Sequence, residues 1–237
     1  MVDGTIAGRP YRFRLDTGAA RTCIVADDFT AALSSNTQHH SSGVFAASSN
    51  ALVSVPDLAI GPLTVPDRSP AADAARVLEM DGRGHSYVDV TWPGVTGRAC
   101  WDSGSGITIV DQAFLLSHLA LFEEVGTSVG TDSTGTQAET RIFLMAGPMI
   151  GGALFARHKV AMVDLSLANA HLDQPMDLIL GYTTLRQADW LFDFPARRWA
   201  VTRKPATTRS CSSWQSRCHC TVQRGSSNGS PAASRSR

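Results

Sequence analysis

Residues 14–24 read Arg-Leu-Asp-Thr-Gly-Ala-Ala-Arg-Thr-Cys-Ile, and residues 100–110 read Cys-Trp-Asp-Ser-Gly-Ser-Gly-Ile-Thr-Ile-Val. Each stretch places an Asp-Thr/Ser-Gly triplet, beginning at Asp16 or Asp102, between short runs that contain apolar residues. The second copy follows the first at an offset of 86 residues, and the two align without a gap from residue 2 to residue 24. An internal repeat of this length indicates two related lobes rather than a solenoid.

Composition is that of a globular protein with a packed core. The chain has 237 residues, of which 43% are hydrophobic and 18% charged, and its formal net charge is zero. A neutral chain gives no reason to expect nucleic acid or a membrane surface as the main partner. No apolar run approaches the roughly 20 residues that span a bilayer, and the first residues show no signal peptide. We therefore expect a cytoplasmic protein by default; a true start further upstream is the alternative.

Cysteine and histidine residues give no metal site by their spacing. Cys23 and Cys100 stand in apolar runs beside the two triplets, where small buried thiols are expected. The cluster at 218–220, Cys-His-Cys, has no second pair at zinc-finger spacing. We expect neither a metal nor a cofactor.

Each copy of the repeat predicts the same series of elements: a hairpin, the acidic turn, a strand and a short helical segment. The first copy places them at residues 2–6, 11–15, 22–25 and 27–33, and the second at 87–92, 98–101, 107–110 and 112–119.

Downstream of the second copy, further strands are predicted at 140–145, 158–165, 176–180, 190–194 and 199–202. The first copy is followed by a candidate hairpin at 41–50 but by nothing that matches Leu178-Ile179-Leu180-Gly181. From residue 203 onward, Ser, Arg, Thr and Pro dominate, which is typical of a disordered tail. We therefore divide the chain into a reduced N-terminal lobe (1–84), a C-terminal lobe (85–202) and a tail (203–237).

At residues 16–19, 102–105 and 178–181 the chain resembles the aspartic peptidases, and the retropepsin-like branch more closely than the pepsin branch. The resemblance covers the second lobe nearly whole and the first lobe in part. It implies a mostly β protein with two acid-protease-like lobes, each a closed β-barrel with short helices, and with the first lobe reduced. It also implies an aspartic endopeptidase whose catalytic residues are Asp16 and Asp102.

The chemistry of peptide hydrolysis explains why two carboxylates are needed. Water must lose a proton while the carbonyl oxygen gains one, and two carboxylates that share one proton can perform both transfers. Gly18 and Gly104 let the backbone turn sharply. In the family, the hydroxyls that here belong to Thr17 and Ser103 hold the two turns together.

The residue after each triplet differs between the copies. We expect Ser105 to donate a hydrogen bond to a carboxylate, which Ala19 cannot do. Asp102 would then carry more of the negative charge and Asp16 more of the proton. The first turn lacks an evident brace, so we expect the neighbouring lobe or residues 76–80 to support it.

The predicted substrate is an extended peptide or protein segment that binds as an added strand. We expect the tip of a hairpin to fold over it, formed by Thr131, Asp132, Ser133, Thr134, Gly135 and Thr136, and residues 41–50 to form a second, smaller cover. A monomer is favoured. The alternatives are a homodimer that uses Asp102 from each chain, and a peptide-binding module without catalysis.

Overall fold

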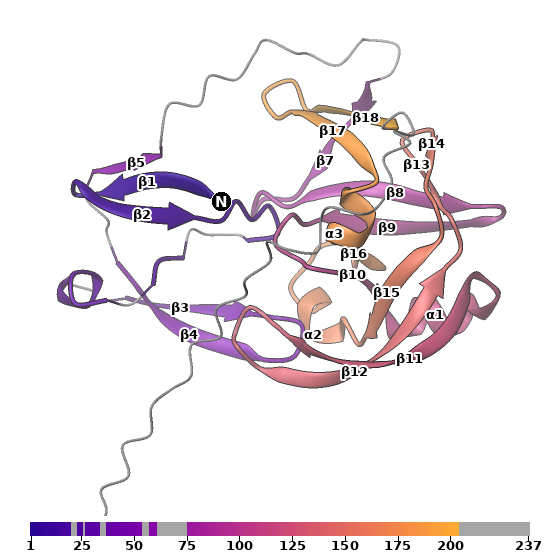
Figure 1. Ribbon diagram of the computed structural model, residues 1–237, viewed down its shortest axis with the longest axis horizontal. Coiled ribbons are helices and arrows are strands. Elements are labelled where there is room, and N and C mark those ends of the chain that lie inside the picture. The colour runs from indigo at the N-terminus through magenta and orange to yellow at the C-terminus, as the bar shows by residue number, and fades with distance from the viewer. Residues whose placement is uncertain (20–22, 26, 34–36, 54–56, 61–74, 204–237) are drawn as a thin grey trace, which may run out of the picture. The chain divides into compact units, whose positions relative to one another are not determined.

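The structure, a computed structural model of the 237-residue chain, describes residues 1–19, 23–25, 27–33, 37–53, 57–60 and 75–203. Residues 204–237, which hold nearly all of the predicted tail and its Cys-His-Cys cluster, lie outside the described residues. The protein is mostly β, with a few short helices (Figure 1). The division into lobes at 84/85 stays a prediction.

The hairpin that precedes each acidic turn forms in both copies. β1 (Val2–Ile6) pairs with β2 (Arg9–Phe13), and β8 (Ser86–Trp92) pairs with β9 (Val95–Trp101). Gly8 and Gly94, which the repeat aligns, stand in the two connecting turns with φ of 74° and 76°. This left-handed backbone is the one that glycine adopts without steric cost, so the same residue serves the same turn twice.

A ten-stranded sheet contains the second acidic turn. Its strands follow the order β11-β12-β15-β10-β16-β9-β8-β13-β14, and β7 pairs with β8 beside this path. The bounds not yet given are β7 Glu79–Met80, β10 Thr108–Asp111, β11 Phe122–Thr131, β12 Gln137–Met145, β13 Met149–Ile150, β14 Ala153–Leu154, β15 His158–Val163 and β16 Leu178–Leu180. Among the described strands, the two ends of the path, β11 and β14, are not neighbours. The predicted closed barrel is therefore not detected, and the sheet stays open.

Apolar side chains cover both faces of this sheet. The larger core cluster includes Val90, Val110, Val160, Leu178 and Leu180, all without exposed surface. The smaller cluster on the other side consists of Tyr87, Cys100, Val163, Leu165, Met176 and Ile179. A strand that is buried on both faces reads as a continuous apolar run, which is why residues 178–180 were recognisable in the sequence.

A second, three-stranded sheet closes the C-terminal part. β17 (Ala188–Asp193) pairs with β18 (Arg198–Arg203), and β18 pairs with β6 (Arg76–Val77). Its aromatic side chains contact one another and Trp101 of β9: the rings of Trp190 and Trp199 are stacked with their centres 6.0 Å apart, and the ring of Phe192 lies edge to face with that of Trp101 at 4.7 Å. These contacts anchor the residue that immediately precedes Asp102 to the aromatic cluster.

The N-terminal part is sparser, as the sequence predicts. It contains the sheet β2-β1-β5, with β5 at Leu58–Ile60, and the hairpin of β3 (Thr37–Ser42) and β4 (Ala47–Leu52). Ile6 is buried, but Leu58 and Ile60 are exposed.

One predicted element of this part is not seen. A strand was expected at 22–25, yet residues 23–25 form none, and 20–22 lie outside the described residues. Val25 is 77% exposed, so this apolar run has no sheet on which to be buried.

The helices are shorter than predicted. The segment 27–33 forms only the 3-10 turn η1 (Thr30–Ala32). At its start, the Asp27 carboxylate accepts a hydrogen bond of 2.8 Å from the Thr30 amide. The segment 112–119 forms α1 (Gln112–Ser117), capped by the Asp111 carboxylate, followed by the 3-10 turn η2 (Leu119–Leu121). Two further one-turn helices are α2 (Ser166–Asn169) and α3 (Tyr182–Leu185). In the described part of the chain, no helix combines the length and the apolar composition needed to cross a membrane.

Candidate active site

The two acidic turns face each other and exchange hydrogen bonds. The Thr17 hydroxyl donates to the Trp101 carbonyl at 3.0 Å and accepts from the Ser103 amide at 3.1 Å. In the opposite direction, the Ser103 hydroxyl donates to the Leu15 carbonyl at 3.0 Å and accepts from the Thr17 amide at 3.3 Å. The pattern is symmetric, because Leu15 and Trp101 occupy the same place in the repeat. The predicted role of the two hydroxyls in linking the turns agrees with these contacts.

Glycine at the third position of each triplet makes room for the opposite aspartate. A Cβ atom added to Gly18 would lie 2.7 Å from both carboxylate oxygens of Asp102. A Cβ added to Gly104 would lie 2.5 Å from Oδ1 of Asp16 and closer still to its other carboxyl atoms. Real Cβ atoms do not come so near, so both positions require glycine. The two carboxyl groups thus sit at the centre of the paired turns.

Each carboxylate is also held by its own turn. The Gly18 amide donates to Oδ1 of Asp16 at 3.1 Å, and the Gly104 amide donates to Oδ1 of Asp102 at 2.7 Å. The pKa of Asp102 is raised to about 6, chiefly by burial and then by the charge of Asp16, while the hydrogen bond from the Gly104 amide opposes the shift. Asp16 is exposed and Asp102 half-buried. Because like charges in contact resist joint ionisation, the pair retains a proton well above the ordinary range of a carboxyl group.

The expectation for Ser105 is wrong. Its hydroxyl donates to the Ile107 carbonyl at 2.7 Å and is therefore not available to Asp102, which receives the backbone amide of Ser105 instead. The Ile107 carbonyl, two residues away in the same loop, takes the hydroxyl hydrogen in place of the Asp102 carboxylate. The predicted excess of negative charge on Asp102 loses its basis, since burial acts in the other direction and favours the protonated form of Asp102.

The segment 178–181 braces the second turn. The Asp102 amide donates to the Leu180 carbonyl at 3.0 Å, and the Tyr182 amide donates to the Ser105 carbonyl at 2.9 Å. Gly181 lies against the loop so closely that an added Cβ would meet the Ser105 carbonyl oxygen at 2.9 Å and overlap the carbonyl of Ile107.

The first turn is supported differently. Residues 76–80, one of the two braces proposed for it, pair with β18 and β8 instead. The second acidic turn supplies the contacts, through the Trp101 carbonyl and the Ser103 hydroxyl.

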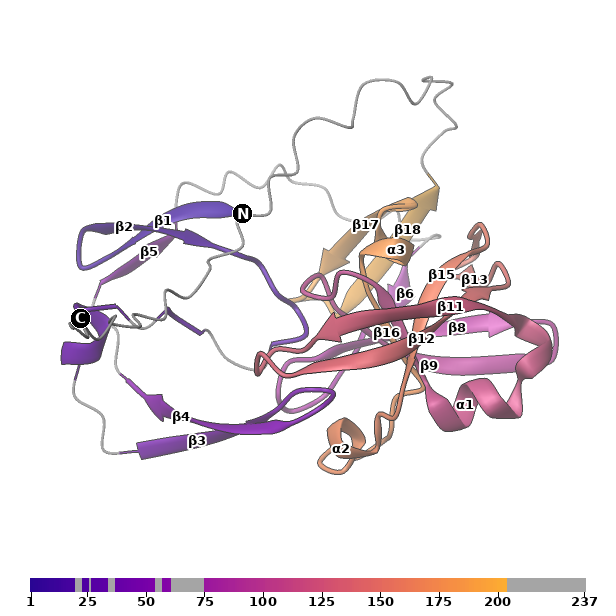
Figure 2. The same ribbon diagram turned by 60° about the horizontal axis from the view of Figure 1, so that its bottom comes forward.

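The predicted hairpin tip forms, and it contacts the smaller hairpin. Residues 132–136 connect β11 to β12, and both hairpins can be followed in Figure 2. Oδ1 of Asp132 accepts the amides of Thr134 and Thr136 at 2.9 and 3.1 Å, which orders the tip. Oδ2 of Asp132 accepts the amides of Phe45 and Ala46, at 3.0 and 3.2 Å, from the turn between β3 and β4. One carboxylate therefore joins the two hairpin tips.

An apolar row lies beside Asp102 on the same face of the sheet. Cys100 is the register partner of Tyr87 and of Ile179, and Ile179 is the partner of Ile109. Side chains of register partners point to the same side of a sheet, and Asp102 follows Cys100 by two residues. The Cys100 thiol, whose pKa burial raises to about 12, also feels the charges of Asp102 and Asp16, which places it near the pair.

Two residues of the small hairpin cover this row. Val44 and Phe45 are partly buried and pack on the cluster that contains Cys100 and Ile179. The sequence analysis did not single them out. The signal that could have revealed them is two large apolar residues at the centre of an otherwise small and polar hairpin.

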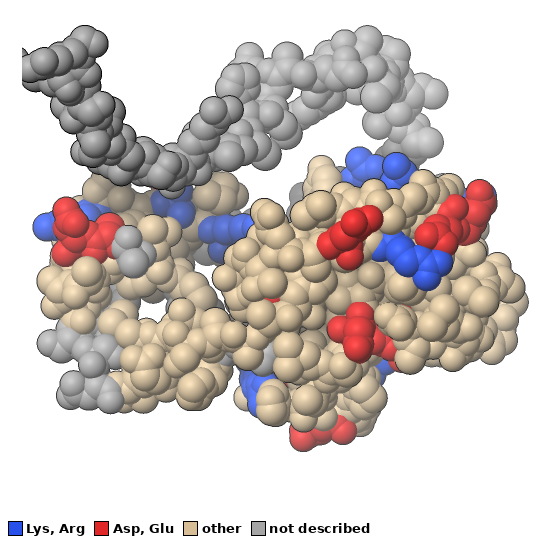
Figure 3. Space-filling model, turned by 90° about the horizontal axis from the view of Figure 1, so that it is seen from below, with Lys and Arg blue, Asp and Glu red and all other residues tan. Residues whose placement is uncertain are grey.

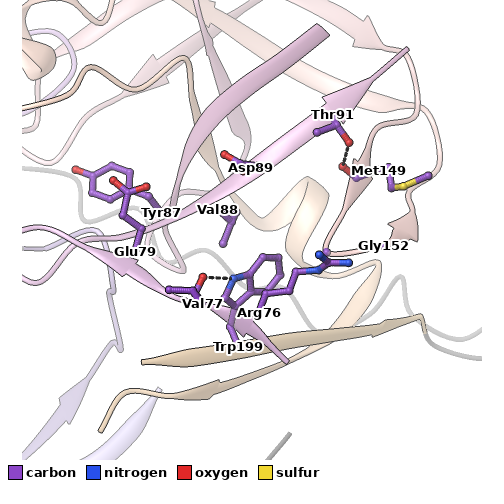
Figure 4. A pocket seen from close by; sticks show the side chains of 11 residues that line it. Arg76, Val77, Glu79, Tyr87, Val88, Asp89, Thr91, Met149, Gly152 and Trp199 are labelled. Atoms are coloured by element: carbon purple, nitrogen blue, oxygen red, sulfur yellow. Dashed lines mark hydrogen bonds between the residues drawn. The ribbon is translucent and has the colours of Figure 1, made fainter. Parts of the chain in front are cut away.

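A hollow elsewhere on the protein is not part of this site. It has a volume of about 360 Å³ and lies between β6, β8, β13 and β18 (Figure 4). Its lining includes Arg76, Glu79, Asp89, Met149 and Trp199, and neither acidic turn contributes to it. In the described part of the chain, no cluster of histidine, cysteine and acidic residues could hold a metal ion.

No family model matches the chain, and no curated protein matches its sequence. Two solved structures are distantly similar. A retropepsin-like aspartic protease from Rickettsia conorii is 13% identical; the match covers 54% of this chain and 89% of that one, with a TM-score of 0.38. The retroviral protease-like domain of Ddi1 from Leishmania major is 18% identical; the match covers 49% of this chain and 90% of that one, with a TM-score of 0.30. These likenesses concern the fold alone, and the function proposed below depends on the geometry of the acidic turns.

Proposed function

We propose that the protein is an aspartic endopeptidase that hydrolyses peptide bonds with water held between Asp16 and Asp102. The observation that carries the proposal is the reciprocal fit of the two turns. Each turn donates a hydroxyl to the other, and each leaves space for the carboxylate of the other at its glycine. Ordinary Asp-Gly turns have no need of either feature.

The protonation of the pair supports the same chemistry. With one proton on two adjacent carboxyl groups, the ionised group takes a proton from water while the protonated group gives one to the carbonyl oxygen of the peptide. The resulting tetrahedral intermediate collapses when the nitrogen of the leaving amine gains a proton. Since the pKa of Asp102 is raised to about 6, the singly protonated state extends from acidic pH to near pH 6 and is lost above it.

The surroundings fit an extended peptide as substrate. The two hairpins joined at Asp132 provide a cover, and strand-like backbone can bind to hairpin edges through main-chain hydrogen bonds. The largely buried row of Cys100, Ile179 and Ile109, covered by Val44 and Phe45, limits the access of water beside the pair. On the face in Figure 3, acidic and basic side chains are interspersed, without a single charged patch that would attract a polyanion.

We propose that one chain suffices for activity, because Asp16 and Asp102 of the same chain meet. In the alternative, two chains pair and each contributes Asp102. Sedimentation of the active protein, combined with the Asp16→Asn variant, separates the two. A monomer that loses activity on this change supports the single-chain site, and an active homodimer that tolerates it contradicts the proposal.

The decisive experiment is cleavage of a diverse peptide pool, followed by mass spectrometry, with the wild type, Asp16→Asn and Asp102→Asn in parallel. Asp89→Asn, an exposed position on β8, is the matched control. We expect cleavage by the wild type and the control, and none by the two site variants. Tight binding of a statine-type inhibitor without cleavage of any peptide would instead indicate a peptide-binding module.

A further inference from the structure

A chain of buried hydrogen bonds runs from Gly181 to His158. The Gly181 amide donates to Thr108 Oγ1 at 3.1 Å, and Thr108 Oγ1 lies 2.6 Å from Thr184 Oγ1. Thr184 Oγ1 lies 2.7 Å from Nε2 of His158, whose Nδ1 lies 2.7 Å from the Ala156 carbonyl oxygen. Thr108 and Thr184 have no exposed surface, and His158 is 8% exposed.

The hydrogen-bonding partners, together with a neutral ring at His158, indicate the direction of each hydrogen bond in this series. A carbonyl oxygen only accepts, so Nδ1 of His158 carries a hydrogen and donates it to Ala156. In the neutral ring Nε2 is then an acceptor and takes the hydrogen of the Thr184 hydroxyl. Thr184 Oγ1 must in turn accept from the Thr108 hydroxyl, which accepts from Gly181. With the ring of His158 neutral, this arrangement satisfies every member; the Gly181 carbonyl, 3.4 Å from Thr108 Oγ1, is a second and longer acceptor for the Thr108 hydroxyl.

The neutral ring follows from its surroundings. Burial lowers the pKa of His158, the positive charge of Arg186 lowers it further, and the hydrogen bond to Ala156 acts in the opposite direction. The carbonyl partner of Nδ1 places the hydrogen of the neutral ring on Nδ1 rather than on Nε2.

This series of buried hydrogen bonds ends directly behind the second acidic turn. Gly181 follows Leu180, whose carbonyl accepts the Asp102 amide at 3.0 Å, and the next residue, Tyr182, donates to the Ser105 carbonyl at 2.9 Å. Leu180 and Gly181 are therefore connected on one side to the loop of Asp102 and on the other to His158. A change at His158 or Thr184 would reach the carboxylate through this short segment.

We infer that His158, acting through Thr184 and Thr108, is a positioning residue that fixes Gly181 and thereby the depth of Asp102 in the paired turns. This inference rests on the proposed function, in which Asp102 is catalytic. His158 touches neither acidic turn in the contacts described, so its effect is on the placement of Asp102 and not on the reacting atoms.

The test compares Thr184→Val, which keeps the shape but removes the hydroxyl, with Thr184→Ser, which restores the hydroxyl. Thr91→Val is the control, because it removes a hydroxyl that donates to Met149 beside the remote hollow. Active sites are counted with a tight-binding inhibitor, so that only folded protein contributes to kcat. We expect Thr184→Val to lower kcat about tenfold with KM nearly unchanged, a loss typical of one displaced transition-state contact. Thr184→Ser and Thr91→Val should act like the wild type.

Two NMR measurements do not depend on turnover. Long-range nitrogen–proton spectra should show His158 neutral with its hydrogen on Nδ1. Carboxyl-carbon titration should show the pKa of Asp102 shifted downward in Thr184→Val, because a loosened turn admits water, and unshifted in Thr184→Ser.

The outcomes separate the two hypotheses. If the wild type cleaves no peptide, the proposed function fails, while the titration of Asp102 still decides whether His158 positions it. A hydrogen on Nε2 of His158, or an unshifted Asp102 in Thr184→Val, overturns the inference even if the protein is an active peptidase.

Discussion

Replacing Thr17 by valine tests whether the two acidic turns hold each other in place. Valine has nearly the same shape but no hydroxyl, so the change removes the bond to the Trp101 carbonyl and the bond from the Ser103 amide. A hydrogen bond contributes roughly 0.5–1.5 kcal/mol net, so the two together contribute about 1–3 kcal/mol. Both groups left without a partner are only half-buried, which keeps the expected loss within this range and not above it.

The structure also predicts that Thr17 and Ser103 act as one unit. Each hydroxyl bonds the backbone of the other turn, so loss of either lets the turns separate and weakens the bonds of the other. In a double-mutant cycle with Thr17→Val and Ser103→Ala, the double variant should lose about 1 kcal/mol less than the sum of the single losses. Activity should fall at least tenfold in each single variant, since about 1.4 kcal/mol of misplacement corresponds to a factor of ten.

The assays are urea unfolding, for the free energy of unfolding, and peptide cleavage at matched concentrations of active sites. Thr17→Ser is the control, because it keeps the hydroxyl and should retain both stability and activity. The reasoning is refuted if Thr17→Val equals the wild type in both assays, if Thr17→Ser is as damaged as Thr17→Val, or if the two single losses add fully.

Three further predictions concern other parts of the site. The raised pKa of Asp102, about 6 in the folded state, means that the folded protein binds this proton more tightly than the unfolded chain. The contribution of Asp102 to stability is therefore present below about pH 4 and is lost as the pH rises through 6. The Asp102→Asn variant should be more stable than the wild type at pH 8 and should show no such gain at pH 3. Equal stabilities of variant and wild type at pH 8 would count against this prediction. The Asp132→Ala variant removes the link between the two hairpin tips. Its KM should rise several-fold, and the amides of the β3–β4 turn should exchange their hydrogens faster. Unchanged exchange would argue against the link. Gly181→Ala forces a Cβ onto the loop after Asp102 and should unfold the protein or abolish cleavage, whereas Gly82→Ala, in open space, should do neither.

The repeat in the sequence predicted how the two acidic turns of the candidate site are built, because its signals are local. A hairpin ending at an Asp-Thr/Ser-Gly triplet needs a glycine turn and a short strand, and both copies contain these within about 20 residues. The apolar run 178–180 was recognisable because a strand buried on both faces must be apolar throughout. The hairpin tip at 131–136 was recognisable from its small and polar residues between two strands.

The sequence analysis failed where one group has several possible partners, or where the partner lies far away in the sequence. Ser105 donates to Ile107, a choice that no pattern of residue types reveals. The hydrogen bond from the Phe45 amide to the Asp132 carboxylate joins residues that are 87 positions apart, and the sequence near either residue does not indicate it. The strand expected at 22–25 is not seen at 23–25, because an apolar run becomes a strand only where a neighbouring sheet covers it. Closure into a barrel likewise depends on a pairing of edges that the sequence does not encode locally.

The glycine of each turn accommodates the aspartate of the other, and this limits which residues either copy of the repeat can carry at that position. A larger residue at Gly18 would displace Asp102, and a larger residue at Gly104 would displace Asp16. Neither copy can therefore accept such a change alone, however much of its surrounding scaffold it sheds. The N-terminal part is sparser than the C-terminal part elsewhere, yet Gly18 and Gly104 meet the same spatial requirement.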